Sequence, residues 1–281
     1  MLSSIAFSIN RMSAPRIPFA DFASMANRLG VGSIEIRNDL SGVEMEDGTP
    51  ASTIGALAKA QGLRIRSINA LQRFEQFDFT RADEAKTMIQ YAVDCNAEAL
   101  VLCPTNSRRD IRIAEQRHSD LVYALRQLKP MLDQAGLIGL IEPLGFEECA
   151  VRRKSQAVRA IQEIGDTTTF KLVHDTFHHH LAGEELFFPE ITGLVHISGV
   201  EDTALSPTEM RDSHRVLVGA GDRLGNVQQL TRLTQAGYAG LASFEPFAEE
   251  IAAATDIESR LAASMAYLLG AVAKGSPAPT A

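Results

Sequence analysis

Short apolar runs, rich in Ile, Val and Leu, recur along the whole chain and alternate with longer segments of helical periodicity. Such runs are typical of strands that are buried on both faces, as in a parallel sheet. The sequence therefore predicts eight strands, at Ser4–Asn10, Gly32–Arg37, Arg64–Leu71, Glu98–Pro104, Gly136–Pro143, Phe170–Asp175, Gly193–Ser198 and Gly240–Pro246.

The segments between these runs carry apolar residues three and four positions apart, which is the spacing of one helix face. Gly30 and Gly62 follow two of these segments, at the position where helices commonly end. After Asp175 the pattern is unclear, because Gly183 and Pro189 interrupt it. The predicted helices are Ala20–Leu29, Ser52–Gln61, Arg81–Cys95, Ile113–Gln134, Ser155–Ile164, Val227–Gln235 and Ile251–Ala273.

Strands that alternate with helices predict a (β/α)8 TIM barrel, formed as a single domain by residues 1–272. An open doubly wound sheet is the alternative. It is disfavoured because no G-x-G-x-x-G motif follows the first strand. Residues 273–281, AKGSPAPTA, have the small and proline-containing composition of a disordered tail.

Composition narrows the range of functions. The chain has 281 residues and a net charge of −8, with no basic run, so we expect no nucleic-acid partner. No apolar run reaches the roughly 20 residues that span a membrane. The chain starts without the pattern of a signal peptide, and its three cysteines form no CxxC motif. These features predict a cytoplasmic protein.

A barrel places its functional residues at the C-terminal ends of its strands. There the last four strands carry Glu142, Asp175, His196 and Glu245, each on the face that alternation turns inward. Three adjacent carboxylates repel one another unless they are protonated or bridged by a cation. Three oxygens and one nitrogen suit Mn²⁺, Mg²⁺, Co²⁺ or Zn²⁺. Taken singly, either glutamate could cap a helix, and the histidine could be a hydrogen-bonded core residue.

Four of the seven histidines lie in one segment, LVHDTFHHHLAGE, at Leu172–Glu184. His174 has the opposite strand parity from Asp175, so we expect it to pack or hydrogen-bond outside the barrel. His179 is as consistent with exposure to solvent as with burial. The segment is therefore not interpreted as a metal site of four histidines.

Two further polar residues lie at the ends of the second and third strands. Arg37 and Asn69 are both on predicted inward faces and could bind substrate hydroxyl groups. Structural roles fit these two residues equally well.

The chain resembles the xylose isomerase-like TIM barrels, a superfamily that also contains endonuclease IV and the ketose 3-epimerases. Within it, the DTFHHH and RVLVGAG segments resemble most closely the inosose isomerase (2-keto-myo-inositol isomerase) branch. The resemblance covers most of the chain. It is carried by IEIR (34–37), INAL (68–71), IEPLGFEECAVR (141–152), LVHDTFHHHLAG (172–183), VHI (195–197), HRVLVGAG (214–221) and SFEPF (243–247).

By this resemblance, the four strand-end residues bind one divalent metal ion. Glu142 and Glu245 also inherit the roles of catalytic acid and base. His178, in the family's Asp-x-x-His pattern, would contact substrate oxygens. Arg215 would bind or polarise the substrate near the metal. The implied reaction is isomerisation of a polyhydroxylated ketone, an inosose, through an enediolate, with glutamate-mediated proton transfer between neighbouring carbons.

The sequence departs from the inosose branch in three places. Ser198 and Gly199 replace an acidic pair that usually follows the metal-binding histidine, the loop before Arg215 is longer, and IEPLG (141–145) replaces the usual Glu-Phe type sequence. The substrate therefore remains open within the class of small polyols and ketoses. The metal identity and the formation of a homo-oligomer are open as well.

Three other functions fit the same fold. A ketose 3-epimerase or a hydroxypyruvate isomerase-like enzyme would use the same metal site. A phosphodiesterase similar to endonuclease IV would need further metal ligands and a surface that binds DNA, which the acidic charge disfavours. A non-catalytic sugar-binding barrel would not need the four ligands.

Overall fold

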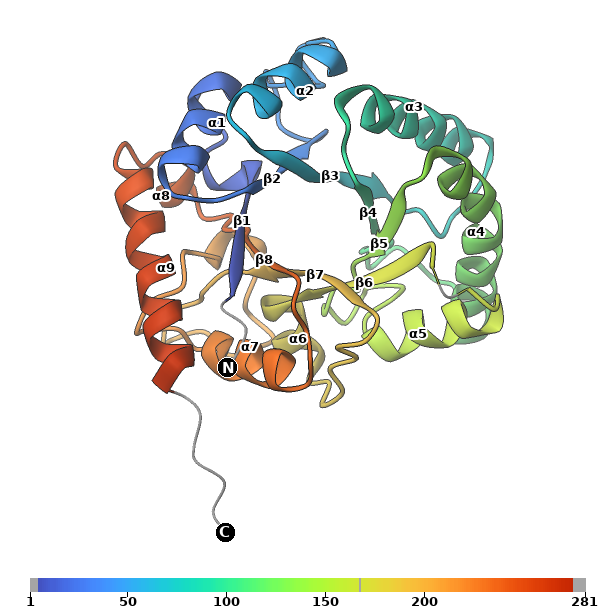
Figure 1. Cartoon of the computed structure of the whole chain (residues 1–281). Coiled ribbons are helices and arrows are strands. Elements are labelled where there is room, and N and C mark those ends of the chain that lie inside the picture. Colours follow the sequence, from blue (N-terminus) through green and yellow to red (C-terminus); the bar gives the residue numbers. More distant parts are fainter. Residues whose placement is uncertain (1–4, 167, 275–281) are drawn as a thin grey trace.

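The structure is a computed structural model that describes residues 5–166 and 168–274. Eight parallel strands close into a barrel in sequence order, with the first strand paired to the eighth (Figure 1). This confirms the predicted TIM barrel, and each strand lies within a few residues of its predicted bounds. The strands are β1 (Ala6–Asn10), β2 (Ser33–Arg37), β3 (Arg64–Gln72), β4 (Ala99–Cys103), β5 (Ile138–Ile141), β6 (Phe170–Asp175), β7 (Thr192–Ile197) and β8 (Leu241–Phe244).

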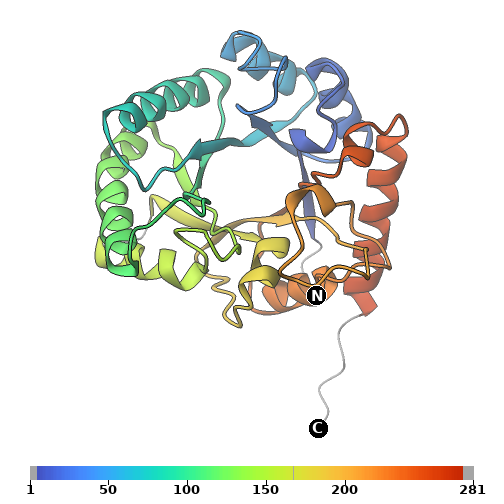
Figure 2. The same ribbon diagram turned by 180° about the vertical axis from the view of Figure 1, so that it is seen from behind.

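Helices surround the barrel on all sides, as the two opposite views show (Figures 1 and 2). Within the described ranges, none of them is long and apolar enough to cross a membrane. They are α1 (Phe19–Arg28), α2 (Ala51–Ala60), α3 (Phe79–Cys95), α4 (Ala114–Ala135), α5 (Lys154–Glu163), α6 (Thr176–Ala182), α7 (Asn226–Gln235), α8 (Glu249–Ala252) and α9 (Ile257–Lys274), with short 3₁₀ turns at Arg11–Ser13 and Asp212–His214.

The structure corrects the predicted C-terminal helix. Ile251–Ala273 was predicted as one helix, but the chain turns between α8 and α9. Ile251 and Ile257, on either side of the turn, are both buried in the core. Asp256 directly precedes α9, where a side-chain acceptor favours the start of a new helix. The predicted tail also begins too early, because Ala273 and Lys274 belong to α9; the rest of it lies outside the described residues.

The segment whose pattern was unclear in the sequence is the short helix α6, which follows β6 directly. Asp175 is its N-cap, and the carboxylate Oδ1 accepts hydrogen bonds from the backbone N–H groups of Phe177 at 2.7 Å and His178 at 3.1 Å. Such a cap satisfies N–H groups that a helix start leaves without partners. The same residue thus ends a strand, begins a helix and faces the barrel interior.

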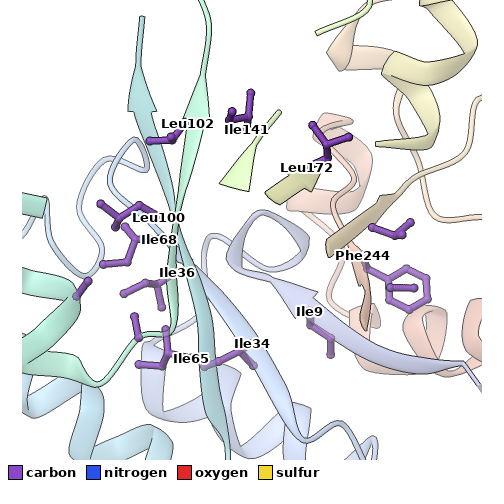
Figure 3. Close-up of a cluster of buried hydrophobic side chains, with 14 of the residues drawn as sticks. Ile9, Ile34, Ile36, Ile65, Ile68, Leu100, Leu102, Ile141, Leu172 and Phe244 are labelled. Atoms are coloured by element: carbon purple, nitrogen blue, oxygen red, sulfur yellow. The ribbon is translucent and has the colours of Figure 1, made fainter. Parts of the chain in front are cut away.

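Strand alternation places two clusters of buried apolar residues on opposite sides of the barrel wall. The larger cluster lies between the barrel and its helices and includes outward-facing residues such as Ile34, Leu102 and Phe244 (Figure 3). The smaller cluster fills the barrel and contains Val101 and Leu140. Because the apolar residues inside the barrel end below its C-terminal mouth, the polar side chains at the strand ends meet on top of a packed apolar layer.

Candidate active site

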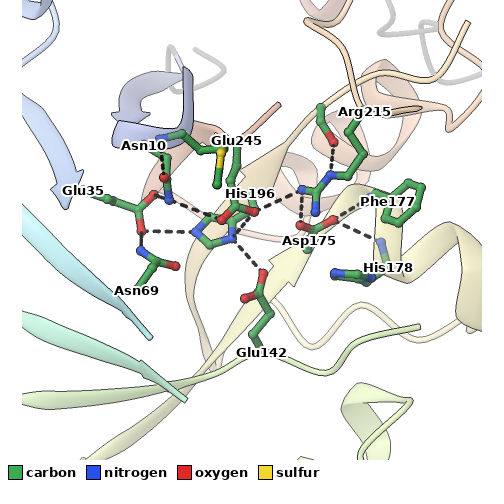
Figure 4. Close-up of polar contacts among 12 residues, drawn as sticks. Asn10, Glu35, Asn69, Glu142, Asp175, Phe177, His178, His196, Arg215 and Glu245 are labelled. Carbon is green, nitrogen blue, oxygen red and sulfur yellow. Dashed lines mark hydrogen bonds and ion pairs between the residues drawn. The ribbon is translucent and has the colours of Figure 1, made fainter. Parts of the chain in front are cut away.

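The barrel brings the four predicted ligands together at its C-terminal mouth (Figure 4). Asp175 ends β6 and is paired in register with His196 of β7, while Glu142 and Glu245 directly follow β5 and β8. All four are buried, and one donor atom from each lies within 4.8 Å of the others. Atoms bound to one divalent ion are separated by at most twice the metal–ligand distance, about 4–5 Å. The donor set therefore fits a single ion.

The imidazole of His196 lies between carboxylates. Its Nδ1 is 2.8 Å from Oε1 of Glu142 and 3.2 Å from Oε2 of Glu245, and its Nε2 is 3.2 Å from Oε2 of Glu35. Burial by itself lowers the pKa of His196, but the charges of Glu245, Glu35 and Glu142 raise the pKa well above its ordinary value. The metal-free protein thus balances its acidic cluster with an imidazolium, a role that a divalent cation would take over.

Two arginines also balance the acidic charge. Nη2 of Arg215 lies 2.6 Å from Oδ2 of Asp175 and 3.1 Å from Oε2 of Glu245, and its Nε donates to Oγ of Ser198 at 2.8 Å. Nη1 of Arg37 lies 2.7 Å from Oε1 of Glu245. Both guanidinium groups are buried. They were predicted to contact substrate; here each is held in place by carboxylates and also lines the cavity.

The two glutamates are held very differently. Both oxygens of Glu245 are engaged, Oε1 by Arg37 and Oε2 by Arg215 and His196. Burial raises the pKa of Glu245, but these neighbours lower it far below the usual range. In Glu142, Oε1 faces His196, whereas the contact of Oε2 is the Cys103 thiol, 3.5 Å away. Glu142 therefore has the freer carboxylate oxygen.

Glu35 of β2 is a member of the cluster that sequence reasoning missed. Its Oε2 accepts a hydrogen bond from Nδ2 of Asn69 at 2.9 Å, so the amide of this predicted substrate-binding residue is directed at Glu35. Burial raises the pKa of Glu35, but the charge and hydrogen bond of His196 lower it to about 2. The sequence did indicate that Glu35 faces the barrel interior, because it lies on the same strand face as Arg37, two residues later.

A cavity of about 370 Å³ opens directly above this cluster. Its volume falls in the range of pockets that hold small ligands. Leu144, Phe146 and Phe247 supply apolar surface. The predicted site residues on its wall are Arg37, Asn69, Glu142, His178, Arg215 and Glu245.

His178 reaches the cavity from α6. The residue is buried, and its ring packs edge-on against Phe146 and Phe177, with centroid distances of 5.4 and 5.2 Å. Its Nδ1 is buried with no hydrogen-bond partner among the described residues. This nitrogen is therefore available for a hydrogen bond with a ligand.

His174 and His179 of this segment lie outside the site. His174 faces away from the barrel interior, as its parity predicts, and is buried with its Nε2 2.8 Å from Oε1 of Gln229. His179 is half-buried rather than exposed, with its Nδ1 2.7 Å from Nζ of Lys154. Neither belongs to the set of donor atoms around the candidate ion position.

Solved structures with the same fold include a protein from Salmonella typhimurium LT2 that contains a xylose isomerase domain. It is 32% identical, with a TM-score of 0.88 over 96% of this chain and 99% of that chain. The IOLI protein with a binding zinc atom is 19% identical, with a TM-score of 0.83 over 98% of this chain and 100% of that chain. No curated protein matches this chain in sequence.

A structure of D-psicose 3-epimerase with D-tagatose from Clostridium cellulolyticum H10 is 13% identical, with a TM-score of 0.74 over 95% of this chain and 99% of that chain. At such identities, this structure and the zinc-bound IOLI protein show a shared fold. The sequence pattern of the xylose isomerase-like TIM barrel family matches residues 23–269 of this chain. With this match and the relative from Salmonella, the chain belongs to the xylose isomerase-like TIM barrel family.

Proposed function

We propose that this protein is a divalent-metal-dependent isomerase or epimerase of a polyhydroxylated ketone, with inosose (2-keto-myo-inositol) as the first candidate substrate. The observation that carries the proposal is the convergence of four donor atoms within 4.8 Å of one another beneath a cavity of about 370 Å³. Three unpaired cysteines are consistent with the expected reducing cytoplasm.

Glu142, Asp175, His196 and Glu245 would hold the ion. When bound, a divalent ion acts as a Lewis acid toward a ketone oxygen and makes the neighbouring C–H more acidic. Mn²⁺, Mg²⁺, Co²⁺ and Zn²⁺ all accept such a donor set. The structurally similar IOLI protein binds a zinc atom, which supports a metal ion as the cofactor of this protein.

The remaining chemistry is proton transfer by carboxylates of the chain. Among the described residues, the contact of Glu142 Oε2 is the Cys103 thiol, and Glu142 lines the cavity, so this oxygen can approach a substrate carbon. Glu245 is kept ionised by Arg37 and Arg215, which makes it the more tightly positioned of the two. We assign proton removal and return at neighbouring carbons to this pair.

Substrate recognition would fall to groups around the pair. The buried His178, Arg215 and Arg37 present nitrogen atoms to a site that excludes much of the solvent, where hydrogen bonds to ketone and hydroxyl oxygens are strengthened. Phe146 and Phe247 offer apolar faces to the C–H side of a polyol. The similar fold of D-psicose 3-epimerase makes epimerisation of a small ketose the alternative activity.

The decisive experiment follows deuterium incorporation from D₂O into candidate ketones by NMR. The panel contains 2-keto-myo-inositol, D-fructose, D-psicose and D-tagatose, each with the metal-stripped protein and with added Mn²⁺, Co²⁺ or Zn²⁺. An abasic-site DNA duplex is included as a substrate of the phosphodiesterase class.

Metal-dependent exchange at a carbon next to the ketone, with formation of the isomer or epimer, is the expected result. Exchange that is equally fast after chelation would contradict the metal proposal. Cleavage of the duplex without exchange into any ketone would move the protein to the phosphodiesterase class. Tight binding of a ketone without exchange would identify a sugar-binding barrel instead.

A further inference from the structure

A second polar cluster lies on the outer side of β6, away from the cavity. Lys154, the first residue of α5, is buried, and its Nζ is 2.9 Å from Nδ1 of His174 and 2.7 Å from Nδ1 of His179. Oε2 of Glu184 lies 3.9 Å from the same Nζ. Burial lowers the pKa of Lys154 to about 7, and below this pH its ammonium group can only donate, so both histidines accept at Nδ1.

The proton positions of this cluster follow from backbone carbonyls. Nε2 of Gln229 donates to the carbonyl oxygens of Thr176 at 3.0 Å and Leu224 at 2.9 Å, because a carbonyl can only accept. Oε1 of Gln229 must then accept from Nε2 of His174, 2.8 Å away. The proton of neutral His174 is therefore on Nε2, and its Nδ1 is free to accept from Lys154.

The two histidines flank the functional part of the segment. His174 directly precedes Asp175, and His179 directly follows His178. Because side chains alternate along β6, His174 faces the helices while its neighbour Asp175 faces the candidate ion position. Lys154 therefore contacts this segment from outside the barrel, at the residue before Asp175 and at the residue after His178.

Glu184, two residues after α6, also connects the end of α6 to the start of α5. Glu184 accepts from the backbone N–H groups of Lys154 at 2.9 Å and Ser155 at 3.0 Å, which caps the start of α5. On the other side of α6, a Cβ on Gly145 would lie 2.1 Å from the carbonyl oxygen of His178, so only glycine allows this close approach. The helix is therefore fixed against the chain that follows β5.

We propose that Lys154 is a positioning residue for the candidate active site. Its hydrogen bonds to His174 and His179 hold β6 and α6 so that Asp175 reaches the metal position and His178 reaches the substrate. Asp175 divides its oxygens between the two tasks, since Oδ1 caps α6 while Oδ2 contacts Arg215. A shift of α6 would therefore move the carboxylate that is to bind metal. This inference rests on the proposed function.

The test compares Lys154→Met, which keeps an unbranched side chain one atom shorter but removes the donors, with Lys129→Met. Lys129 is a matched control, because its Nζ lies 2.9 Å from both Asp133 and Asp166 and it also makes ionic contacts on the outside of the barrel. Both full-length variants are checked for cooperative unfolding and titrated with Mn²⁺. Imidazole nitrogen NMR of the metal-free proteins reports the tautomers of His174 and His179.

We expect Lys154→Met to raise the Kd for Mn²⁺ at least about fivefold, by analogy with outer groups that orient metal ligands. The Nδ1 signal of His179 should lose its acceptor character in this variant, whereas Gln229 should still hold the proton of His174 on Nε2. Lys129→Met should leave both readouts unchanged. A folded Lys154→Met protein with a wild-type Kd for Mn²⁺ would overturn the proposal, and so would an equal effect of Lys129→Met.

If Lys154→Met does not fold, His179→Leu decides the question. It removes the contact to α6 and leaves Lys154 with His174 and Glu184, and the proposal expects at least about a threefold rise in the Kd for Mn²⁺. An unchanged Kd overturns the proposal. A wild-type protein that binds neither Mn²⁺ nor Zn²⁺ would instead contradict the proposed function, while the tautomers of the metal-free protein would still report on the cluster around Lys154.

Discussion

Oε2 of Glu35 lies 3.2 Å from Nε2 of His196, on the side of the ring opposite to the Glu142 carboxylate that approaches Nδ1. A carboxylate behind a metal-binding imidazole fixes the ring orientation and raises its basicity. In the metal-bound protein, neutral His196 would donate its Nε2 proton to Glu35 and keep Nδ1 for the ion. This carboxylate–histidine pair would therefore orient His196 as a metal ligand.

Glu35→Gln should weaken metal binding about tenfold, because an amide accepts the Nε2 proton less strongly than a carboxylate. Titration with Mn²⁺, followed by calorimetry or electron paramagnetic resonance, measures the effect. Glu44→Gln is the matched control, since Glu44 is also buried and pairs with Arg11 at 2.7 Å beside a different cavity. Equal Kd values for wild type and Glu35→Gln would refute the supporting role.

Glu35 also shows what the sequence could and could not predict. The strand-end rule selects the last residues of each strand, and it correctly brought Glu142, Asp175, His196 and Glu245 together. Glu35 lies deeper in the barrel, two residues before the end of β2, so the rule passed over it. Applying alternation to the whole strand would have found it, because a glutamate on an inward face needs a partner.

Other features had a weak local signal or none. No glycine or proline marks the turn between α8 and α9, and Asp256 before α9 is a weak sign of a new helix start. The break follows from packing Ile251 and Ile257 on separate elements. The contacts of Lys154 join residues 20 to 30 positions apart. Alternation predicted that His174 faces outward. Its partners Lys154 in α5, His179 in α6 and Gln229 in α7, however, depend on how the helices pack around the barrel.

Replacing each glutamate by glutamine separates proton transfer from charge balance. Glu142→Gln and Glu245→Gln should each lower kcat at least about 10²-fold while metal is retained, because an amide oxygen can bind an ion but cannot take up a proton. Metal content is checked for each variant alongside the rate. Near-normal turnover of one loaded variant would assign the proton transfer elsewhere.

The same two variants should differ in stability. Glu245→Gln leaves Arg37 and Arg215 without their shared anionic partner, whereas the ion pair of Glu142 within the described part of the chain is with His196. Breaking a buried ion pair is costly, so we expect Glu245→Gln to lose about 2 kcal/mol more free energy of unfolding than Glu142→Gln. Denaturant unfolding of the metal-free proteins tests this, and equal stabilities would contradict the charge balance described above.

Two substitutions of Asp175 separate its proposed role as a metal ligand from its role as the N-cap of α6. Asp175→Asn keeps an oxygen that can cap α6, whereas Asp175→Ala removes it. Both changes should weaken metal binding, but the alanine variant should be less stable by about 1 kcal/mol, the usual cost of a lost N-cap. Unfolding of the two metal-free proteins provides the comparison. A more stable alanine variant would show that the cap contributes nothing here.

Acid should destabilise the fold through the histidines around Lys154. Burial, followed by the charge of Lys154, lowers the pKa of His179 to about 3. The unfolded chain takes up this proton near pH 6.5 and the folded chain only near pH 3, so the unfolded state binds more protons between these values. Stability must therefore fall as the pH drops through this window, by at most about 2 kcal/mol from this residue at about pH 5.

His179→Gln tests this prediction, because its Oε1 can still accept from Lys154 but does not titrate. Its free energy of unfolding should fall less than that of the wild type between about pH 7 and about pH 5. His118→Gln is the control, since His118 pairs with Glu163 near the surface at 2.8 Å and should not reproduce the effect. Identical losses in wild type and His179→Gln would mean that His179 is as easily protonated in the folded protein as in the unfolded chain. Neutral imidazole at Nδ1 would then not be the acceptor for Lys154.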